Sequence, residues 1–148
     1  MSYPYSFVFI HGLKPNPIGT IEEHARDTWT APGGESWLTG DIPRYLPRAR
    51  VFLYGYNSSA VFDTGDIDIA KEAETLLRLI KEKRVREVNP PIIFVGYSLG
   101  GLVAILVSIS QDLQSTALYI ISTLLTISRS GTVTFSHGRR FQRNCECI

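Results

Sequence analysis

The residues best able to do chemistry lie around Ser98. An apolar run, residues 92–95, leads into Gly96-Tyr97-Ser98-Leu99-Gly100-Gly101, and Ser98 is the centre of a G-x-S-x-G pattern. This pattern is typical of a sharp strand-to-helix turn that presents a serine hydroxyl at the C-terminal edge of a sheet. Glycines fit beside it because a serine in a strained backbone conformation leaves its neighbours no room for a Cβ. Ser98 is therefore predicted to be a nucleophile, and the alternative is an ordinary glycine-rich turn.

A serine nucleophile needs partners. At neutral pH its hydroxyl requires a histidine base, and the base requires an acid that holds its tautomer. Around this kind of turn both follow the serine in the chain, the acid first. After Ser98 the only acids are Asp112 and Glu146, and the only histidine is His137. His137 is thus the candidate base, and an exposed histidine without a catalytic role is the alternative.

Two more apolar runs, residues 6–10 and 50–54, are expected to be strands beside the one that carries Ser98. Runs without polar alternation are typical of parallel sheets, which are covered on both faces. Functional groups in such sheets gather at the C-terminal ends of the strands. The ends following the two runs begin at His11 and Gly55, and both are expected near Ser98.

His11 and Gly12 close the first of these runs. Gly12 permits a sharp exit from the strand. A histidine in this position is more often a residue that shapes the loop than one that carries a proton.

The connecting segments have different characters. Residues 14–36 are rich in proline and glycine and are predicted to be a long loop, and Ser36 is predicted to cap a short helix over about residues 37–46. The clearest helix is capped by Asp66 or Asp68 and has a buried apolar face at helical spacing. That face comprises Ile69, Ala73, Leu76, Leu77 and Ile80. Alternating strands and helices predict an α/β fold with a doubly wound parallel sheet.

Composition limits the classes of function. The 148 residues are 44% hydrophobic and 20% charged, as in a globular protein, and a net charge of +1 gives no reason to expect nucleic acid as a partner. The N-terminus lacks the basic segment of a signal peptide. Cys145 and Cys147 are too close together for a structural disulfide and are expected to stay reduced, as inside a cell.

Residues 6 to about 104 resemble the N-terminal half of an α/β-hydrolase domain. Within that fold they are most similar to the lipase-like, serine-active-site-containing protein group, which includes fungal domains of unknown function. The resemblance is carried by Phe9-Ile10-His11-Gly12-Leu13, Trp37-Leu38 before Asp41-Ile42-Pro43, Ala49-Arg50-Val51-Phe52-Leu53-Tyr54-Gly55-Tyr56, and Gly96-Tyr97-Ser98-Leu99-Gly100-Gly101-Leu102-Val103. Tyr97 stands where many members have histidine, a change that the turn tolerates.

The resemblance implies a sheet of α/β-hydrolase type that is incomplete at its C-terminus. It implies hydrolysis of small-molecule or lipid esters, with Ser98 as nucleophile and with the backbone N–H groups of Leu13 and Leu99 as oxyanion hole. The residues of its motifs are His11, Gly12, Gly96, Gly100 and Gly101. No cofactor and no metal are implied. The expected location is intracellular and cytoplasmic, with association to mitochondrial or endoplasmic reticulum membranes as an alternative.

From about residue 105 the sequence stops resembling the family. The chain is therefore divided into a half-domain, residues 1–110, and a divergent tail, residues 111–148. The apolar residues 115–127 of the tail are fewer than the roughly 20 that a bilayer span needs, so a packed helix or strand pair is expected. The basic residues 139–143 are too few to indicate nucleic-acid binding.

Two functions are consistent with these observations. The first is a serine esterase or lipase. The second is a truncated or pseudo-enzymatic α/β-hydrolase module that acts as a binding or signalling domain. Without a base beside Ser98, reaction with a serine-directed probe is expected to be slow or absent, because loss of a triad member leaves only residual catalysis.

Overall fold

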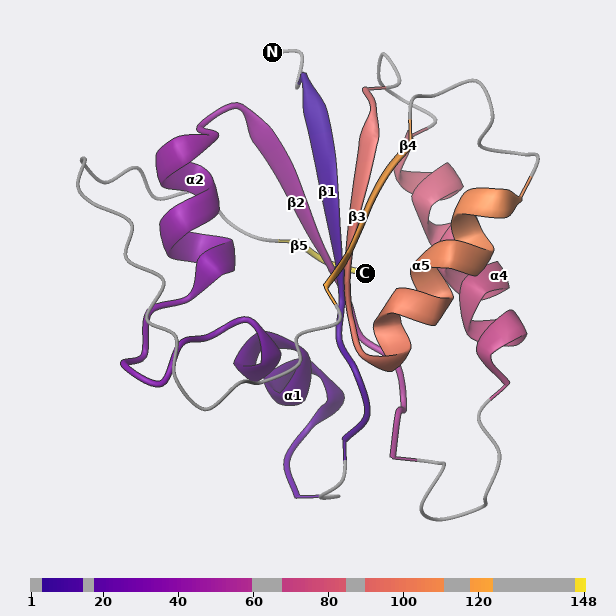
Figure 1. The fold of residues 1–148 in the computed structure, drawn as a ribbon, viewed down its shortest axis with the longest axis horizontal. Helices are drawn as coiled ribbons and strands as arrows, with labels where there is room; N and C mark the ends of the chain where they lie inside the picture. The colour runs from indigo at the N-terminus through magenta and orange to yellow at the C-terminus, as the bar shows by residue number, and fades with distance from the viewer. Residues whose placement is uncertain (1–3, 15–17, 60–67, 85–89, 111–117, 124–145) are drawn as a thin grey trace.

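A parallel sheet forms the centre of the molecule. The computed structural model describes residues 4–14, 18–59, 68–84, 90–110, 118–123 and 146–148. The strand order is β4-β3-β1-β2-β5, and every neighbouring pair is parallel (Figure 1). The strands are β1 (Tyr5–Ile10), β2 (Ala49–Tyr54), β3 (Ile92–Tyr97), β4 (Leu118–Thr123) and β5 (Glu146–Cys147). The three strands predicted from apolar runs are present, and the predicted α/β arrangement is confirmed.

The register brings three strand ends to one edge. Ile10, the last residue of β1, pairs with Tyr54 of β2 on one side and with Gly96 of β3 on the other. The residues that follow these strands therefore start at the same level. This places His11 between the segment after Tyr54 and the turn at Ser98.

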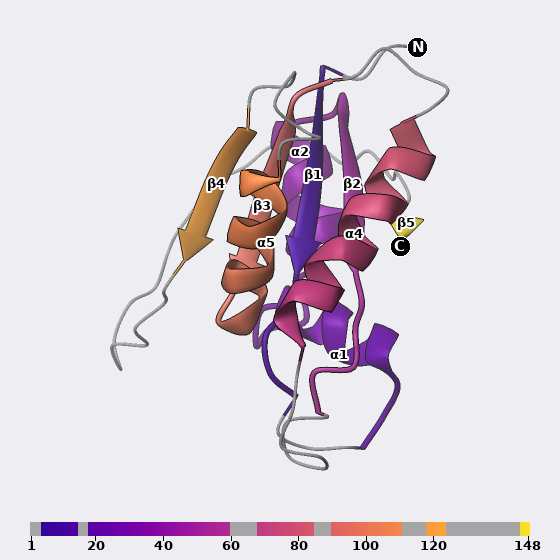
Figure 2. The same cartoon turned by 90° about the vertical axis from the view of Figure 1, so that its right-hand side faces the viewer.

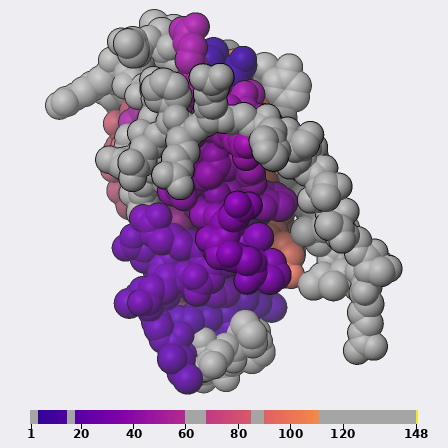
Figure 3. Space-filling model, turned by 90° about the vertical axis from the view of Figure 1, so that its left-hand side faces the viewer, coloured from indigo at the N-terminus to yellow at the C-terminus, as the bar shows by residue number. Residues whose placement is uncertain are grey.

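Helices cover both faces of the sheet. On one face lie α1 (Ile21–Thr28), the π-helical turn η1 (Trp37–Asp41) and α2 (Ile42–Tyr45). Residues of this part of the chain make up much of the surface in Figure 3. On the other face α4 (Ile69–Arg84) packs beside α5 (Leu99–Ile109) (Figure 2).

The path of the chain explains this division. The chain covers one face as it runs from β1 to β2, and the opposite face as it returns past β1 to β3 and β4. Crossovers of a single hand change face whenever the direction across the sheet reverses. The reversal occurs between β1 and β3, the position at which open α/β sheets bind ligands.

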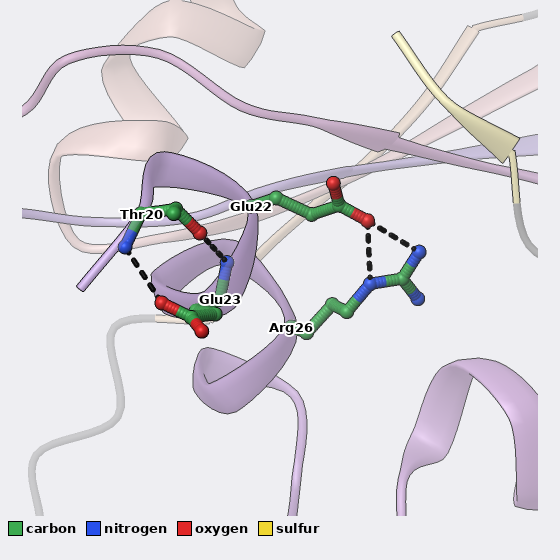
Figure 4. A network of polar contacts seen from close by, with 4 residues as sticks. All are labelled: Thr20, Glu22, Glu23 and Arg26. Atoms are coloured by element: carbon green, nitrogen blue, oxygen red, sulfur yellow. Dashed lines mark hydrogen bonds and ion pairs between the residues drawn. The ribbon is translucent and has the colours of Figure 1, made fainter.

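Helix α1 lies inside the segment predicted to be a loop, so that prediction is wrong. The helix begins with a capping box, in which the Thr20 Oγ1 accepts from Glu23 N at 3.1 Å and Thr20 N donates to the Glu23 carboxylate at 2.7 Å (Figure 4). Both bonds satisfy N–H groups that a helix start leaves without partners. The Thr20 N–H bond to the carboxylate, with a smaller contribution from the Thr20 side chain, also holds the pKa of Glu23 below its usual range. An ion pair between Glu22 and Arg26, one turn apart, adds to the same helix (Figure 4).

Of the two helix N-caps predicted from the sequence, the structure confirms one. Asp68 caps α4, because its carboxylate accepts from Lys71 N at 3.0 Å, while Asp66 lies outside the described residues. Ser36 precedes η1 without a capping bond from its side chain, so that prediction is wrong. The segment starts as a π-turn and becomes α-helical only at α2, where Pro43 occupies the first turn that proline tolerates.

Helix α4 uses the predicted apolar face. Ala73, Leu76 and Ile80 are buried against the sheet, and Ile69 and Leu77 are partly buried beside them. In the segment predicted to be a divergent tail, β4 and β5 extend the two sides of the sheet, and the division at residue 110 stays a prediction. Within the described ranges, no helix is both long and apolar enough to cross a membrane.

Candidate functional site

Ser98 occupies a strained turn between β3 and α5. Its backbone has φ 53° and ψ −120°, and among the described residues it is the only one other than glycine with a positive φ. Such a conformation costs of order 1–3 kcal/mol and persists only where the surroundings enforce it. The Ser98 residue is exposed, at the C-terminal edge of the sheet.

Backbone packing around glycines enforces the turn. A Cβ on Gly96 would lie 2.6 Å from Gly100 O and from the backbone of Gly101. A Cβ on Gly100 would overlap Ile10 O and lie 2.5 Å from His11 O. The glycines of the motif are therefore required because backbone segments touch there: Gly96 lies against the start of α5, and Gly100 lies against the end of β1.

The end of β1 lies against the Ser98 turn. A Cβ on Gly12 would lie 2.9 Å from Ser98 Cβ and 2.9 Å from Tyr97 O. Leu13 follows this contact directly, and Leu99 is the first residue of α5, whose N–H has no partner within the helix. The two segments expected to form an oxyanion hole thus meet at the serine, and the role of their N–H groups stays a prediction.

His11 is a buried residue with both ring nitrogens engaged. The side chain has no exposed surface. Nε2 accepts from Tyr56 N at 3.1 Å, and Nδ1 lies 2.8 Å from Gly12 O. The ring also stacks on Tyr56, with centroids 4.4 Å apart. This is the environment of a loop-shaping residue.

The same environment keeps His11 neutral. Burial, more than any other cause, lowers its pKa to about 4, and the nearby charges of His24 and Lys14 act in the same direction. Hydrogen bonds with the backbone of Gly12 and Tyr56 oppose the shift. At neutral pH the ring therefore carries one proton, and its unprotonated nitrogen, Nε2, already accepts from Tyr56 N, so it is not available to take a proton from Ser98.

Two residues lie in the site that the sequence motifs do not place there. His24 on α1 lies edge-on to His11, with centroids 4.8 Å apart, and its Nε2 is 3.4 Å from Gly12 O. Lys14 is buried, and its Nζ donates to Gly19 O at 2.6 Å. The Thr20-Ile-Glu-Glu23 spacing could have signalled α1 and so placed His24, whereas nothing in the sequence indicates the position of Lys14.

The predicted base is not brought to Ser98 within the described residues, because His137 lies outside them. Of the two acids that follow Ser98 in the chain, Asp112 also lies outside the described residues, and Glu146 lies in β5, paired with Phe52 on the far side of β2. Among the described residues, none makes a hydrogen bond to the Ser98 hydroxyl. No group of three or more histidine, cysteine or acidic residues there could hold a metal ion.

Fold and site together define a class: an α/β protein with a parallel sheet and a strained serine at its switch point. Comparison with known proteins does not assign the chain to a family within this class, since no family model, no curated protein and no solved structure matches it. The likeness to α/β-hydrolases therefore rests on the sequence motifs and their placement.

Proposed function

We propose that the chain is a serine acyl hydrolase of α/β-hydrolase type, related to the lipase-like group, that acts on small-molecule or lipid esters. The observation that carries the proposal is the Ser98 backbone, a positive-φ serine between a parallel strand and a helix start. A strained serine of this kind is retained where its hydroxyl must be displayed. We include an intracellular location in the proposal, because Cys145 and Cys147 are expected to stay reduced.

In the proposed reaction, Ser98 Oγ attacks the ester carbonyl and its proton passes to a base. The carbonyl oxygen becomes an oxyanion, which the N–H groups of Leu13 and Leu99 stabilise. Loss of the alcohol leaves an acyl-serine, and water releases the acid. His137 is the one histidine that follows Ser98 in the sequence, and it is the proposed base.

A second function, a binding module without turnover, is favoured by one observation. His11, which lies beside the serine turn, has both nitrogens committed to the backbone and a depressed pKa. It holds the loop instead of activating the hydroxyl. A chain in which His137 stays away from Ser98 would display a serine that does not react at a useful rate.

Labelling with a fluorophosphonate probe tests the proposal. We expect an adduct on Ser98 that disappears in Ser98→Ala. Ser108→Ala is the matched control, because Ser108 is on the same helix and its hydroxyl donates only to Ile105 O. Intact-mass and peptide mass spectrometry locate the adduct. Labelling that survives in Ser98→Ala would overturn the proposal.

The rate of labelling separates the two functions. Rapid labelling that falls by orders of magnitude in His137→Ala identifies a hydrolase with His137 as base. Slow labelling of Ser98 that is the same in His137→Ala identifies a module that does not turn over. His24→Ala is measured alongside, since His24 also lies next to Gly12.

A further inference from the structure

Tyr56 makes two separate hydrogen bonds to one residue of the site. Its phenol OH donates to His11 O at 2.9 Å, and its backbone N–H donates to His11 Nε2 at 3.1 Å. The two rings are stacked at an interplanar angle of 17°. His11 is fully buried and Tyr56 nearly so, so these bonds are shielded from water. Shielded bonds of this kind hold a single arrangement.

Sheet register explains how residues so distant in the chain meet. Ile10 pairs with Tyr54, and each strand ends there. His11 and Tyr56 are therefore the first and second residues beyond a paired position at the same edge. The contact is a consequence of the β1–β2 pairing and not of a flexible loop.

The Tyr56 N–H fixes the tautomer of His11. Because Nε2 accepts from this N–H, the ring proton is on Nδ1. Nδ1 lies 2.8 Å from Gly12 O and so donates to it. The Nε2 atom of His24, on α1, lies 3.4 Å from the same Gly12 O. The Gly12 carbonyl is thereby directed toward the two histidines.

Peptide geometry carries this orientation to Leu13. In a trans peptide, the C=O of one residue and the N–H of the next point in opposite directions. None of the described residues is preceded by a cis bond. With the Gly12 carbonyl held by His11, the Leu13 N–H must point away from the histidines. Gly12 itself lies against Ser98 and Tyr97.

We propose that Tyr56 is a positioning residue: the bond from its OH to His11 O, together with the bond from its N–H to His11 Nε2, fixes the Gly12–Leu13 peptide so that the Leu13 N–H is an oxyanion donor beside Ser98. The inference rests on the proposed acyl-transfer function for its catalytic meaning. The orientation of the Gly12–Leu13 peptide by a tyrosine distant in the chain can be measured whether or not the protein is catalytically active. Preorganised donors matter because they must be aimed before charge develops.

Tyr56→Phe is the decisive variant, with Tyr54→Phe as matched control. Tyr56→Phe removes the OH bond to His11 O and keeps the stacked ring and the backbone N–H. Tyr54 is also buried and stacks on Tyr56 with centroids 5.7 Å apart, but its OH donates to Glu72. Both variants therefore lose one buried hydroxyl, and only one of the two hydroxyls contacts His11.

Two readouts are used. In ¹H–¹⁵N spectra, Tyr56→Phe should shift the Leu13 amide and speed its hydrogen exchange, while Tyr54→Phe leaves both unchanged. In probe labelling, Tyr56→Phe should slow reaction at Ser98 by about 10- to 100-fold relative to Tyr54→Phe, since misplacing one donor has effects of that size. Equal Leu13 spectra, or equal labelling rates, in the two variants would overturn the proposal.

A measurement on the unaltered chain covers the case in which Tyr56→Phe does not fold. Protonating His11 turns Nε2 into a donor that opposes Tyr56 N–H, so the Leu13 amide should shift with the same midpoint as the His11 ring. His24 and Lys14 face His11 and are followed in the same titration. A Leu13 shift with a different midpoint would overturn the proposal. Absence of labelling of the unaltered chain would refute only the proposed function, because the spectra still decide the role of Tyr56.

Discussion

The two sides of the site are held in place by different means. At the end of β1, hydrogen bonds hold His11 and Gly12: Tyr56 donates to His11 through both its OH and its backbone N–H, and the rings of His11 and His24 lie against Gly12 O. At the end of β3, residues 96–101 are held because two glycines, Gly96 and Gly100, let backbone segments touch. Hydrogen bonds can be removed one at a time, with a small loss for each. A backbone contact without room for one carbon atom cannot be weakened gradually.

The same comparison separates a supporting side chain from a displayed one. His11, which supports the loop, is fully buried and neutral, whereas Ser98 is exposed. A buried histidine with two fixed partners cannot rotate to meet a substrate. A serine held out by backbone strain needs no partner in order to be displayed. The supporting histidine and the exposed serine thus lie at the ends of different strands.

Gly100→Ala should have the largest effect, because it forces apart the two strand ends. The new Cβ would overlap Ile10 O and crowd His11 O, and neither backbone atom can move without disturbing β1. We expect a loss of more than about 3 kcal/mol in the free energy of unfolding, measured with denaturant, or failure to fold.

Gly40→Ala is the matched control, since nothing lies within 4 Å of a Cβ at that position in η1. Its unfolding free energy should stay within about 1 kcal/mol of the unaltered chain. If the two substitutions had equal effects, steric contact would not be what holds the β3 end.

Lowering the pH should have the second-largest effect on the free energy of unfolding, because it acts on His11 at the β1 end. The folded pKa of His11 is about 4, below the unfolded value of about 6.5, so the unfolded chain binds a proton first as the pH falls. Stability contributed by neutral His11 is therefore fully present above pH ~6.5 and is lost as the pH falls toward 4. The loss should approach about 3 kcal/mol.

Denaturant unfolding between pH 4 and 7 measures this effect, with His11→Asn as reference because it lacks the titrating ring. The difference in slope between the two chains isolates His11 from the carboxylates that titrate nearby. Parallel pH profiles for the two chains would show that the ring is already accessible to protons in the folded state.

Thr20→Ala should have the smallest effect of the three. It removes the cap of α1, which carries His24 to the Gly12 carbonyl, and N-cap losses are about 1 kcal/mol. Thr39→Ala, at an exposed position of η1, is the control and should be nearly silent in thermal or denaturant melts. Equal melts for the two variants would mean that the β1 end does not depend on how α1 starts.

Much of the fold could be predicted because its signals are local. The three apolar runs give β1, β2 and β3, and the spacing of Ala73, Leu76 and Ile80 gives the buried face of α4. The Ser98 turn is also local, since the glycines that permit it are its neighbours. These features need no knowledge of distant residues.

The features that escaped prediction have two causes. Helix α1 was obscured by the proline and glycine around it, although its capping box is readable between Thr20 and Glu23. The pairing of His11 with Tyr56 has no local signal, because it depends on the register of β1 against β2. His137, the predicted base, lies outside the described residues, so its role stays a prediction.

The central place of β1 has a kinetic consequence. This strand comes first in the chain, yet it pairs with β2 and with β3, which are made much later. Parallel pairings between distant segments form slowly, because the entropy of closing long loops is lost before the contacts are gained. The Ser98 turn rests on Ile10 and Gly12, so it is complete only after both pairings exist. During refolding, the circular dichroism signal of the helices should therefore recover first, and the strained, accessible Ser98 should form last. The rate at which a probe labels Ser98 during refolding would then report the final step of folding.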